Sequence, residues 1–123
     1  TNFGYPKRTS SGFDLNRLNL LAAVISKQTK INLNNFDIYL NVVGGLKIKE
    51  PAVDAAVCAA IISSFKNTKT SEKYCVFGEV GLLGEIRGVN YFEKRVKEAE
   101  KRGFVVIKNC RNLSELNEKL FNK

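Results

Sequence analysis

The chain has 123 residues, 44% of them hydrophobic, which is enough to bury one core and gives no sign of a second. It contains no histidine, which excludes Ser-His-Asp and Cys-His catalysis, and its cysteines form no C-x-x-C pair, so a structural zinc site has too few ligands. Twenty basic residues against twelve acidic ones give a net charge of +8. This balance favours a polyanion such as nucleic acid as a partner, with solvated surface charge as the alternative.

The cysteines also indicate a cellular setting. Cys58, Cys75 and Cys110 are an odd number at wide spacing, which argues against a disulfide framework and predicts a reducing, cytoplasmic location. The sequence begins at Thr1 and shows no targeting segment, so we expect it to be a piece of a longer protein. We predict a connecting arm over residues 1–12 and a single domain over residues 13–123.

The first part of the chain combines basic residues with a helix signal. The predicted arm is polar and holds one short strand at most, and its Lys7-Arg8 pair is a candidate phosphate contact. Asp14 stands where a helix N-cap belongs, and leucines at three- and four-residue spacing predict an amphipathic helix to about Gln28. Arg17 lies off the apolar stripe of this helix and is expected to be exposed.

The middle of the chain is its longest nearly uncharged apolar run. A β-branched and aromatic segment predicts a strand over residues 36–43, followed by a glycine-containing loop. Pro51 then opens a helix at the position where a missing N–H costs nothing. Between residues 52 and 65 the apolar side chains fall on every side of the helical wheel, with Asp54 the sole charge, so we expect the helix to be enclosed by protein.

The last half of the chain predicts further alternation of strands and helices. A strand over residues 73–77 precedes the glycine-rich segment 78–88, which matches no phosphate-loop pattern and predicts turns between two short strands. A helix over residues 91–102 ends at Gly103, a short buried strand covers residues 104–107, and Ser114 caps a last helix. This order predicts an α/β fold, an α+β sandwich of helices on a sheet. Six phenylalanines fit core positions: Phe13, Phe36, Phe65, Phe77, Phe92 and Phe104.

Several basic residues are candidates for contacts with a DNA backbone. Lys47 and Lys49 fit best, because they follow Gly44-Gly45 and point to one side if the loop is extended. Arg87 beside Gly88 is a comparable candidate, whereas Arg17 and the Lys7-Arg8 pair could equally belong to a subunit interface. The helix after residue 91 mixes both signs of charge, including an i, i+4 pair of Glu98 and Arg102, and predicts a self-compensated surface.

Three segments in the same order carry a resemblance to a known family. They are residues 8–21 (RTSSGFDLNRLNLL), residues 41–64 (NVVGGLKIKEPAVDAAVCAAIISS) and residues 76–87 (VFGEVGLLGEIR). Together they resemble the C-terminal domain of the bacterial DNA recombination and repair proteins called RadA or Sms, over about residues 4–107. That domain is similar to the proteolytic domain of the Lon ATP-dependent protease. The implied fold is that of the second domain of ribosomal protein S5.

The resemblance implies a role within a larger machine. In that family a zinc-finger segment and a RecA-like ATPase core lie upstream, so zinc, ATP and Mg are implied for domains absent from this chain, and no cofactor is implied for the chain itself. The family forms a homohexameric ring that binds DNA and drives branch migration of recombination intermediates. The Lon-like domain is expected to contribute ring assembly and non-sequence-specific DNA contact. The alternative is a pure oligomerisation scaffold without direct DNA contact.

A Lon-like peptidase is a further alternative that the sequence argues against. Lon proteases need a serine nucleophile activated by a lysine base. Alignment on Pro51 places Ala52 at the nucleophile position, and equal glycine spacing places Glu93 at the lysine position. Lys94 is one residue further, a rotation of about 100° around a helix. Ser63 and Ser64 are interpreted as helix-terminal hydroxyls, so we predict no peptidase activity.

Overall fold

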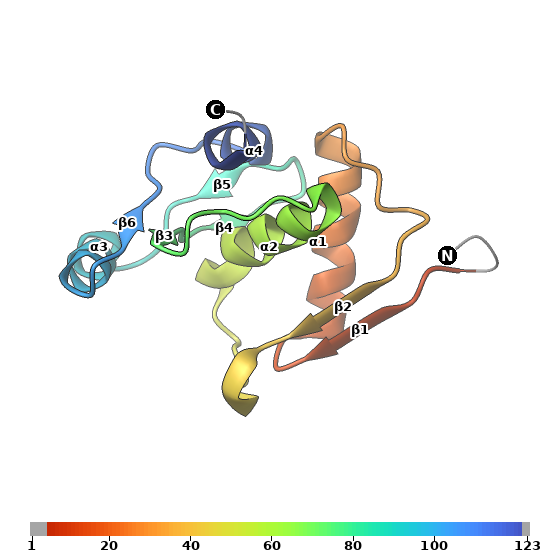
Figure 1. Cartoon of the computed structure of the whole chain (residues 1–123), viewed down its shortest axis with the longest axis horizontal. Helices are drawn as coiled ribbons and strands as arrows, with labels where there is room; N and C mark the ends of the chain where they lie inside the picture. Colours follow the sequence, from red (N-terminus) through yellow and green to blue (C-terminus); the bar gives the residue numbers. More distant parts are fainter. Residues whose placement is uncertain (1–4, 122–123) are drawn as a thin grey trace. The chain divides into compact units, whose positions relative to one another are not determined.

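The computed structural model describes residues 5–121, which mix helices and strands as predicted for an α/β protein (Figure 1). The chain divides into two compact units, Thr1–Glu50 and Pro51–Lys123. The division therefore falls at the proline that was predicted to open the central helix. No helix in the described range combines the length and apolar character that crossing a bilayer requires.

Unit 1 is a β-α-β arrangement of two parallel strands joined by a helix. Strand β1 (Arg8–Ser11) pairs with β2 (Ile38–Asn41), and helix α1 (Leu15–Gln28) connects them. Figure 1 shows β1 and β2 running side by side. β1 lies inside the segment predicted as an arm, and the boundary at residue 12 stays a prediction.

Helix α1 confirms the predicted start and end. The Asp14 carboxylate accepts the Arg17 backbone N–H at 2.9 Å, which satisfies one of the unpaired donors of the first turn. One face of the helix is buried, and the buried residues are Leu18, Leu21, Ala22, Val24 and Ile25. The four-residue β2 is shorter than the predicted strand, because a turn closed by the Phe36 N–H and the Leu33 carbonyl precedes it and a 3₁₀ turn η1 (Val43–Gly45) follows it.

The chain after η1 packs against the turn that joins β1 to α1. The Ile48 N–H donates to the Gly12 carbonyl at 2.7 Å. Gly12 has a φ of +84°, and a Cβ there would lie 2.3 Å from the Leu46 carbonyl oxygen. A glycine is therefore required at this close approach, and the approach fixes the loop that carries Lys47 and Lys49.

Unit 2 alternates helices with short strands. β3 (Tyr74–Cys75) pairs with β6 (Val105–Val106) in parallel. β4 (Glu79–Val80) and β5 (Ile86–Arg87) form an antiparallel hairpin, which confirms the turns predicted between two short strands in residues 78–88. Its elements in order are η2 (Pro51–Val53), α2 (Asp54–Lys66), β3 (Tyr74–Cys75), β4 (Glu79–Val80), β5 (Ile86–Arg87), α3 (Phe92–Lys101), β6 (Val105–Val106) and α4 (Leu113–Phe121).

The start of α2 is bound to the β4–β5 hairpin. The Gly78 N–H donates to the Ala52 carbonyl at 2.8 Å, and the Ala55 N–H donates to the Gly78 carbonyl at 3.0 Å. Asp54 is the one buried charged side chain among residues 5–121, and its carboxylate accepts the Val80 N–H at 3.1 Å. A carboxylate in the first turn also interacts favourably with the helix dipole, so this junction stabilises a buried charge.

Two predictions about burial are wrong. α2 is not enclosed, because Ala56, Ala60, Ser64 and Phe65 are exposed while the opposite side is buried. Alanine favours helices through its backbone propensity, so an alanine-rich face indicates a helix without indicating burial.

The phenylalanines do not form the core either. Phe36, Phe65, Phe92 and Phe104 are exposed, Phe13 and Phe77 are half-buried, and the buried side chains of the described chain are mainly leucine, isoleucine, valine and alanine. The exposed phenylalanines lie in loops or at helix ends, where few side chains surround a ring. β6 is also only partly buried, because Val105 is 52% exposed.

The helices at the end of the chain have one confirmed and one corrected terminus. Gly103 has a φ of +89° just after α3, as predicted for a residue that ends a helix. α4 is capped by Asn112, whose side-chain oxygen accepts the Glu115 N–H at 2.9 Å, and not by Ser114. The two assignments differ by two residues, since serine and asparagine are equally good caps and the sequence offers both.

Candidate nucleic-acid interface

The loop after η1 presents two exposed lysines beside open glycine backbone. Lys47 and Lys49 are both exposed and flank the half-buried Ile48. Gly44 and Gly45 have φ values of +84° and +70°, and no atom lies within 4 Å of the place where a Cβ would stand on either. No carboxylate within residues 5–121 forms an ion pair with these two lysines. The loop can therefore bring positive charge and backbone close to an anion.

The basic residues near β1 are used within the fold. The Lys7 backbone N–H donates to the Asp37 carboxylate at 2.7 Å. Lys7 itself is an exposed residue. The Arg8 guanidinium donates to the carbonyls of Phe36 and, at 3.0 Å, of Leu33. Arg8 thus holds the turn before β2, a structural role that the sequence did not predict.

Arg17 differs from its predicted exposure. This residue is half-buried on α1. A long arginine side chain can lay its methylene stem along apolar surface and keep its charged end in water. A backbone-phosphate contact or a subunit contact at Arg17 stays a prediction.

Arg87 lies between two carboxylates of its own hairpin. Its guanidinium pairs with Glu85 at 3.0 Å and with Glu79, its cross-strand neighbour, at 3.4 Å. The hydrogen bond from Arg87 holds the pKa of the Glu85 carboxyl below its ordinary value, and the same bond raises the pKa of Arg87. The charge predicted to meet phosphate is therefore compensated locally, and DNA contact at Arg87 stays a prediction.

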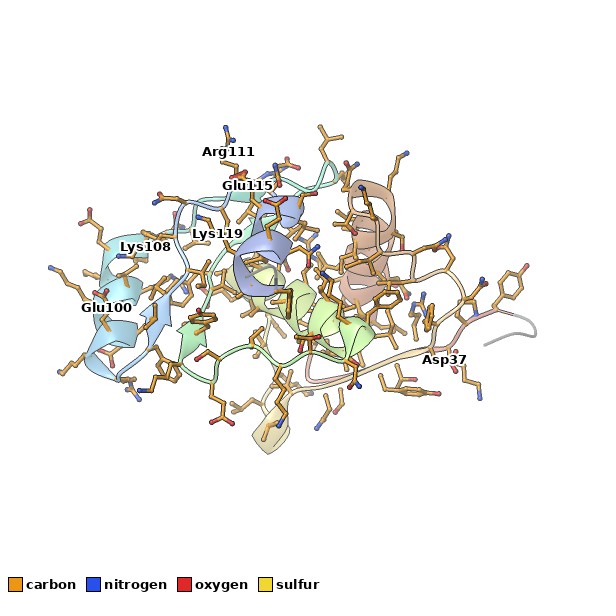
Figure 2. All side chains as sticks on the ribbon, turned by 45° about the horizontal axis from the view of Figure 1, so that its top comes forward. Asp37, Glu100, Lys108, Arg111, Glu115 and Lys119 are labelled. Carbon is orange, nitrogen blue, oxygen red and sulfur yellow. The ribbon has the colours of Figure 1, made fainter. Side chains whose placement is uncertain are left out.

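The charges at the C-terminal end of the chain are also largely paired. Glu98 and Arg102 form the predicted i, i+4 pair at 2.8 Å, which is confirmed. Figure 2 shows the charged side chains around α4, where Arg111 pairs with Glu115 at 3.1 Å. The Lys119 ammonium group donates to the Lys108 carbonyl at 2.8 Å and to the next carbonyl at 3.2 Å.

The two positions that the sequence comparison aligned with a serine-lysine dyad hold neither a serine nor a lysine. Ala52 is 5% exposed and its carbonyl is bound to Gly78, whereas Glu93 is exposed on α3. The Lys94 ammonium group lies over the Tyr91 ring, 5.6 Å from its centroid. The Ser63 hydroxyl donates to the Thr68 carbonyl at 2.6 Å, which confirms its predicted helix-terminal role.

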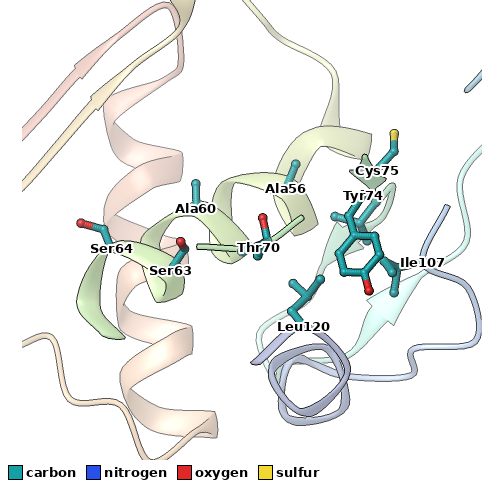
Figure 3. A pocket seen from close by; sticks show the side chains of 11 residues that line it. Ala56, Ala60, Ser63, Ser64, Thr70, Tyr74, Cys75, Ile107 and Leu120 are labelled. Atoms are coloured by element: carbon teal, nitrogen blue, oxygen red, sulfur yellow. The ribbon is translucent and has the colours of Figure 1, made fainter. Parts of the chain in front are cut away.

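The exposed side of α2 lines a pocket that the sequence did not predict. Its volume is about 520 Å³, and its lining includes Ala56, Ala60 and Ser63 of α2 and Tyr74 of β3 (Figure 3). No charged side chain is among its lining residues. The sequence signal for it is the set of small residues three and four apart on α2, a pattern that is equally typical of a buried helix face. Without a cation the pocket is a poor phosphate site. The loop of residues 43–49 with Lys47 and Lys49, called the lysine loop below, therefore remains the best candidate interface.

Two cysteine thiols have altered acidity. Burial raises the pKa of the Cys75 thiol, which lines the pocket, and burial is also the main reason that the pKa of the Cys110 thiol is raised. Thiolate is the nucleophilic form of cysteine, so these environments disfavour reactivity. All three cysteines are free thiols in the structure.

Comparison with known proteins gives one family model and a set of similar repair proteins. The family model described as subunit ChlI of Mg-chelatase matches residues 8–109. The DNA repair protein RadA of Bacillus subtilis is 50% identical over 104 residues, which cover 85% of this chain and 23% of that protein. RadA of Streptococcus pneumoniae is 50% identical over 107 residues, 87% of this chain and 26% of that protein. RadA of Aquifex aeolicus is 48% identical over 99 residues, 80% and 22% respectively. The chain thus spans about a quarter of the length of these relatives.

Proposed function

The chain belongs to the family described as subunit ChlI of Mg-chelatase. From its similarity to RadA proteins we propose that it is a DNA-contacting, non-proteolytic domain of a RadA-type repair protein. The relatives named for DNA repair direct the proposal toward DNA. The observation that carries it is the exposed pair Lys47 and Lys49 beside the open backbone of Gly44 and Gly45. Contacts of this kind bind the phosphates of DNA whatever its base sequence.

The proposal extends to fold and assembly. We assign the chain the Lon-like fold of ribosomal protein S5 domain 2 and a place in a homohexameric, cytoplasmic ring, on the strength of the three resembling segments. The chain spans about a quarter of its relatives. Within residues 5–121 no three histidine, cysteine, aspartate or glutamate side chains gather as a metal site. From the resemblance alone, we assign ATP hydrolysis, Mg, zinc and branch migration to other domains of such a protein.

The absence of peptidase activity is part of the same proposal. A serine-lysine mechanism needs a hydroxyl close to a neutral amine. Ala52 offers a methyl group in a buried position, which cannot attack a peptide carbonyl. The Ser63 hydroxyl lies about three helical turns further along α2 and donates to the Thr68 carbonyl.

Duplex binding at increasing salt tests the proposal. Fluorescence anisotropy of a labelled duplex of mixed sequence gives the affinity of the native chain and of the Lys47→Ala, Lys49→Ala variant. Each phosphate contact contributes about 0.9 to the slope of log affinity against log salt, so we expect the variant to lose about 1.8. A second duplex of unrelated sequence should give the same result, because backbone contacts carry no sequence information.

A matched variant separates specific contact from loss of charge. Lys27→Ala, Lys30→Ala removes the same charge from exposed positions of the same unit, near the end of α1. We expect it to retain most of the salt slope. Equal losses in both variants would place the contact elsewhere, and no binding by the native chain would favour the alternative of an oligomerisation scaffold, which sedimentation then tests.

A further inference from the structure

An apolar pocket with a cationic rim lies where α3 packs on β3 and β6. Its volume is about 410 Å³, and it lies wholly within unit 2. Its lining is Cys75, Phe77, Lys94, Arg95, Glu98, Ala99, Arg102 and Phe104. Two phenylalanine rings and three cations thus meet in one place, a combination not found in the pocket beside α2.

The pocket is built on a packed base. Val96, Ala99 and Val106 form a buried cluster against which Cys75 and Phe77 pack. The Phe77 ring meets the Phe92 ring edge-on, with centroids 6.5 Å apart and planes at 88°. The base of the pocket is therefore preorganised, which lowers the cost of binding a flat ligand.

Phe104 supplies an accessible ring at the edge of this base. Its side chain is 40% exposed, while its backbone N–H is tied to the Ala99 carbonyl at 2.9 Å directly after the left-handed Gly103. Backbone fixed in this way holds the ring at the pocket. An exposed aromatic ring at a fixed place offers a surface on which a planar group can stack.

The rim of the pocket is positively charged. Lys94 and Glu98 lie four residues apart on one face of α3, Arg102 follows at the same spacing as the C-cap residue of the helix, and Arg95 lies beside Lys94. Three cations against one carboxylate leave a net charge of +2 at the rim. Glu98 is paired with Arg102 at 2.8 Å, and the Arg95 Nε–H donates to the Asn90 carbonyl at 2.8 Å. These bonds hold the two arginines in place at the mouth.

We propose that this pocket binds one unstacked base of a single-stranded nucleic acid, with the adjacent phosphates on the cationic rim. The ligand must be flat and apolar in one part and anionic in the next, and a nucleotide within a single strand meets both requirements. Bases of a duplex are stacked on one another and cannot enter. The inference rests on the proposed DNA role and adds a second kind of substrate at a different place from the lysine loop.

The test compares two labelled single strands of equal length, one of thymidines and one of abasic residues, by fluorescence anisotropy with the whole chain. Both strands carry the same phosphates, so their difference in affinity measures the contribution of the base. We expect the thymidine strand to bind more tightly and Phe104→Ala to lose at least about fivefold in affinity for it, from a stacking contribution of about 1–3 kcal/mol per base. The abasic strand should bind both proteins alike.

Two further variants control for folding and for ring exposure. Phe104→Tyr keeps an aromatic face and should restore most of the affinity for the thymidine strand. Phe65→Ala removes a ring that is also 40% exposed but lies outside this pocket, and it should leave that affinity unchanged. Equal binding of the two strands by the native chain, or equal losses in the Phe65 and Phe104 variants, would overturn the inference.

Duplex binding separates this inference from the proposed function. If the duplex binds through Lys47 and Lys49 while Phe104→Ala changes no single-strand affinity, the pocket inference fails and the DNA role stands. If neither duplex nor single strand binds, both fail. If Phe104→Ala alters only sedimentation, the pocket receives a second copy of the chain and the inference is overturned.

Discussion

Two glycine-containing segments carry basic side chains, but only one of them pairs its basic side chain with carboxylates. In the loop of residues 43–49, Gly44 and Gly45 have open space around them and the following lysines are exposed. In the hairpin of residues 78–88, Gly78 and Gly81 are packed, Gly88 has open space around it, and Arg87 is held by two carboxylates. The pattern of glycine beside a cation is the same. What differs is whether the loop supplies its own counter-charge.

The packing of the hairpin glycines explains why it is a structural element. A Cβ on Gly78 would lie 2.4 Å from the Ile86 Cγ2 atom, and one on Gly81 would lie 2.3 Å from the Glu85 carboxylate. Gly78 and Gly81 serve close packing in the hairpin, whereas Gly44 and Gly45 leave free backbone in the other loop. Of these two segments, the loop of residues 43–49 is the one that combines open glycine backbone with cations that no carboxylate of residues 5–121 pairs.

Replacing one glycine in each loop should give the largest difference in stability. Gly78→Ala places a methyl group against Ile86 and beside the junction with α2, so we expect the free energy of unfolding to fall by about 1–3 kcal/mol. Gly45→Ala meets no atom and should cost only about 1 kcal/mol for its left-handed φ of +70°. Urea unfolding measures both, and a Gly45 variant as unstable as the Gly78 variant would contradict the comparison.

The hairpin is also anchored to the start of α4, and removing that anchor should have the next largest effect. The Leu113 N–H donates to the Gly84 carbonyl at 2.9 Å, next to the cap formed by Asn112. Asn112→Ala should lower the free energy of unfolding by about 1 kcal/mol through the lost cap. Ser114→Ala is the control, with an expected cost of about 0.5 kcal/mol or less at an exposed position. A larger cost for Ser114→Ala would restore the cap that the sequence predicted.

The features that the sequence predicted correctly depend on neighbours within about one helical turn. The Asp14 cap, the Gly103 terminus and the Glu98–Arg102 pair each involve residues at most four positions apart. Local geometry decides such contacts, since helical spacing fixes which residues meet. The alternation of helices and strands was predictable for the same reason.

The features that the sequence missed depend on distant partners. Arg8 binds carbonyls 25 and 28 residues away, and Arg87 meets Glu79 only through the register of the hairpin. Strand register is not visible in a single sequence, so the compensation of Arg87 could not be predicted. The exposure of Phe104 likewise follows from how α3 lies on β6, which no local pattern of hydrophobic residues encodes.

Removing the counter-charge of the hairpin should make it behave like the lysine loop. In the Glu79→Gln, Glu85→Gln variant, Arg87 loses both carboxylates and becomes available to phosphate. We expect duplex binding to tighten and the salt slope to steepen by about 0.9, the contribution of one contact. In the native chain Arg87→Ala should change the slope little.

The control for that experiment is Glu72→Gln, Glu118→Gln, which removes the same charge from exposed positions outside the hairpin. A general gain of positive charge would strengthen binding equally in both double variants. An equal gain would therefore contradict release of Arg87, whereas a steeper slope in the hairpin variant alone would support it.

The smallest expected effect is the pH dependence of the same hairpin. The hydrogen bond from Arg87 is the main reason that the pKa of Glu85 is lowered on folding. Because the pKa of Glu85 is lower in the folded chain than in the unfolded chain, its carboxylate stabilises the fold at pH values above the ordinary glutamate pKa of about 4.3. This stabilisation is lost as the pH falls through the folded pKa. The difference in free energy of unfolding between the native chain and Glu85→Gln should be constant near neutral pH and shrink in acid. Urea unfolding from neutral to acid pH measures this difference in free energy. The difference should depend less on pH when Arg87→Ala is present in both proteins, because the group that lowers the pKa of Glu85 has then been removed.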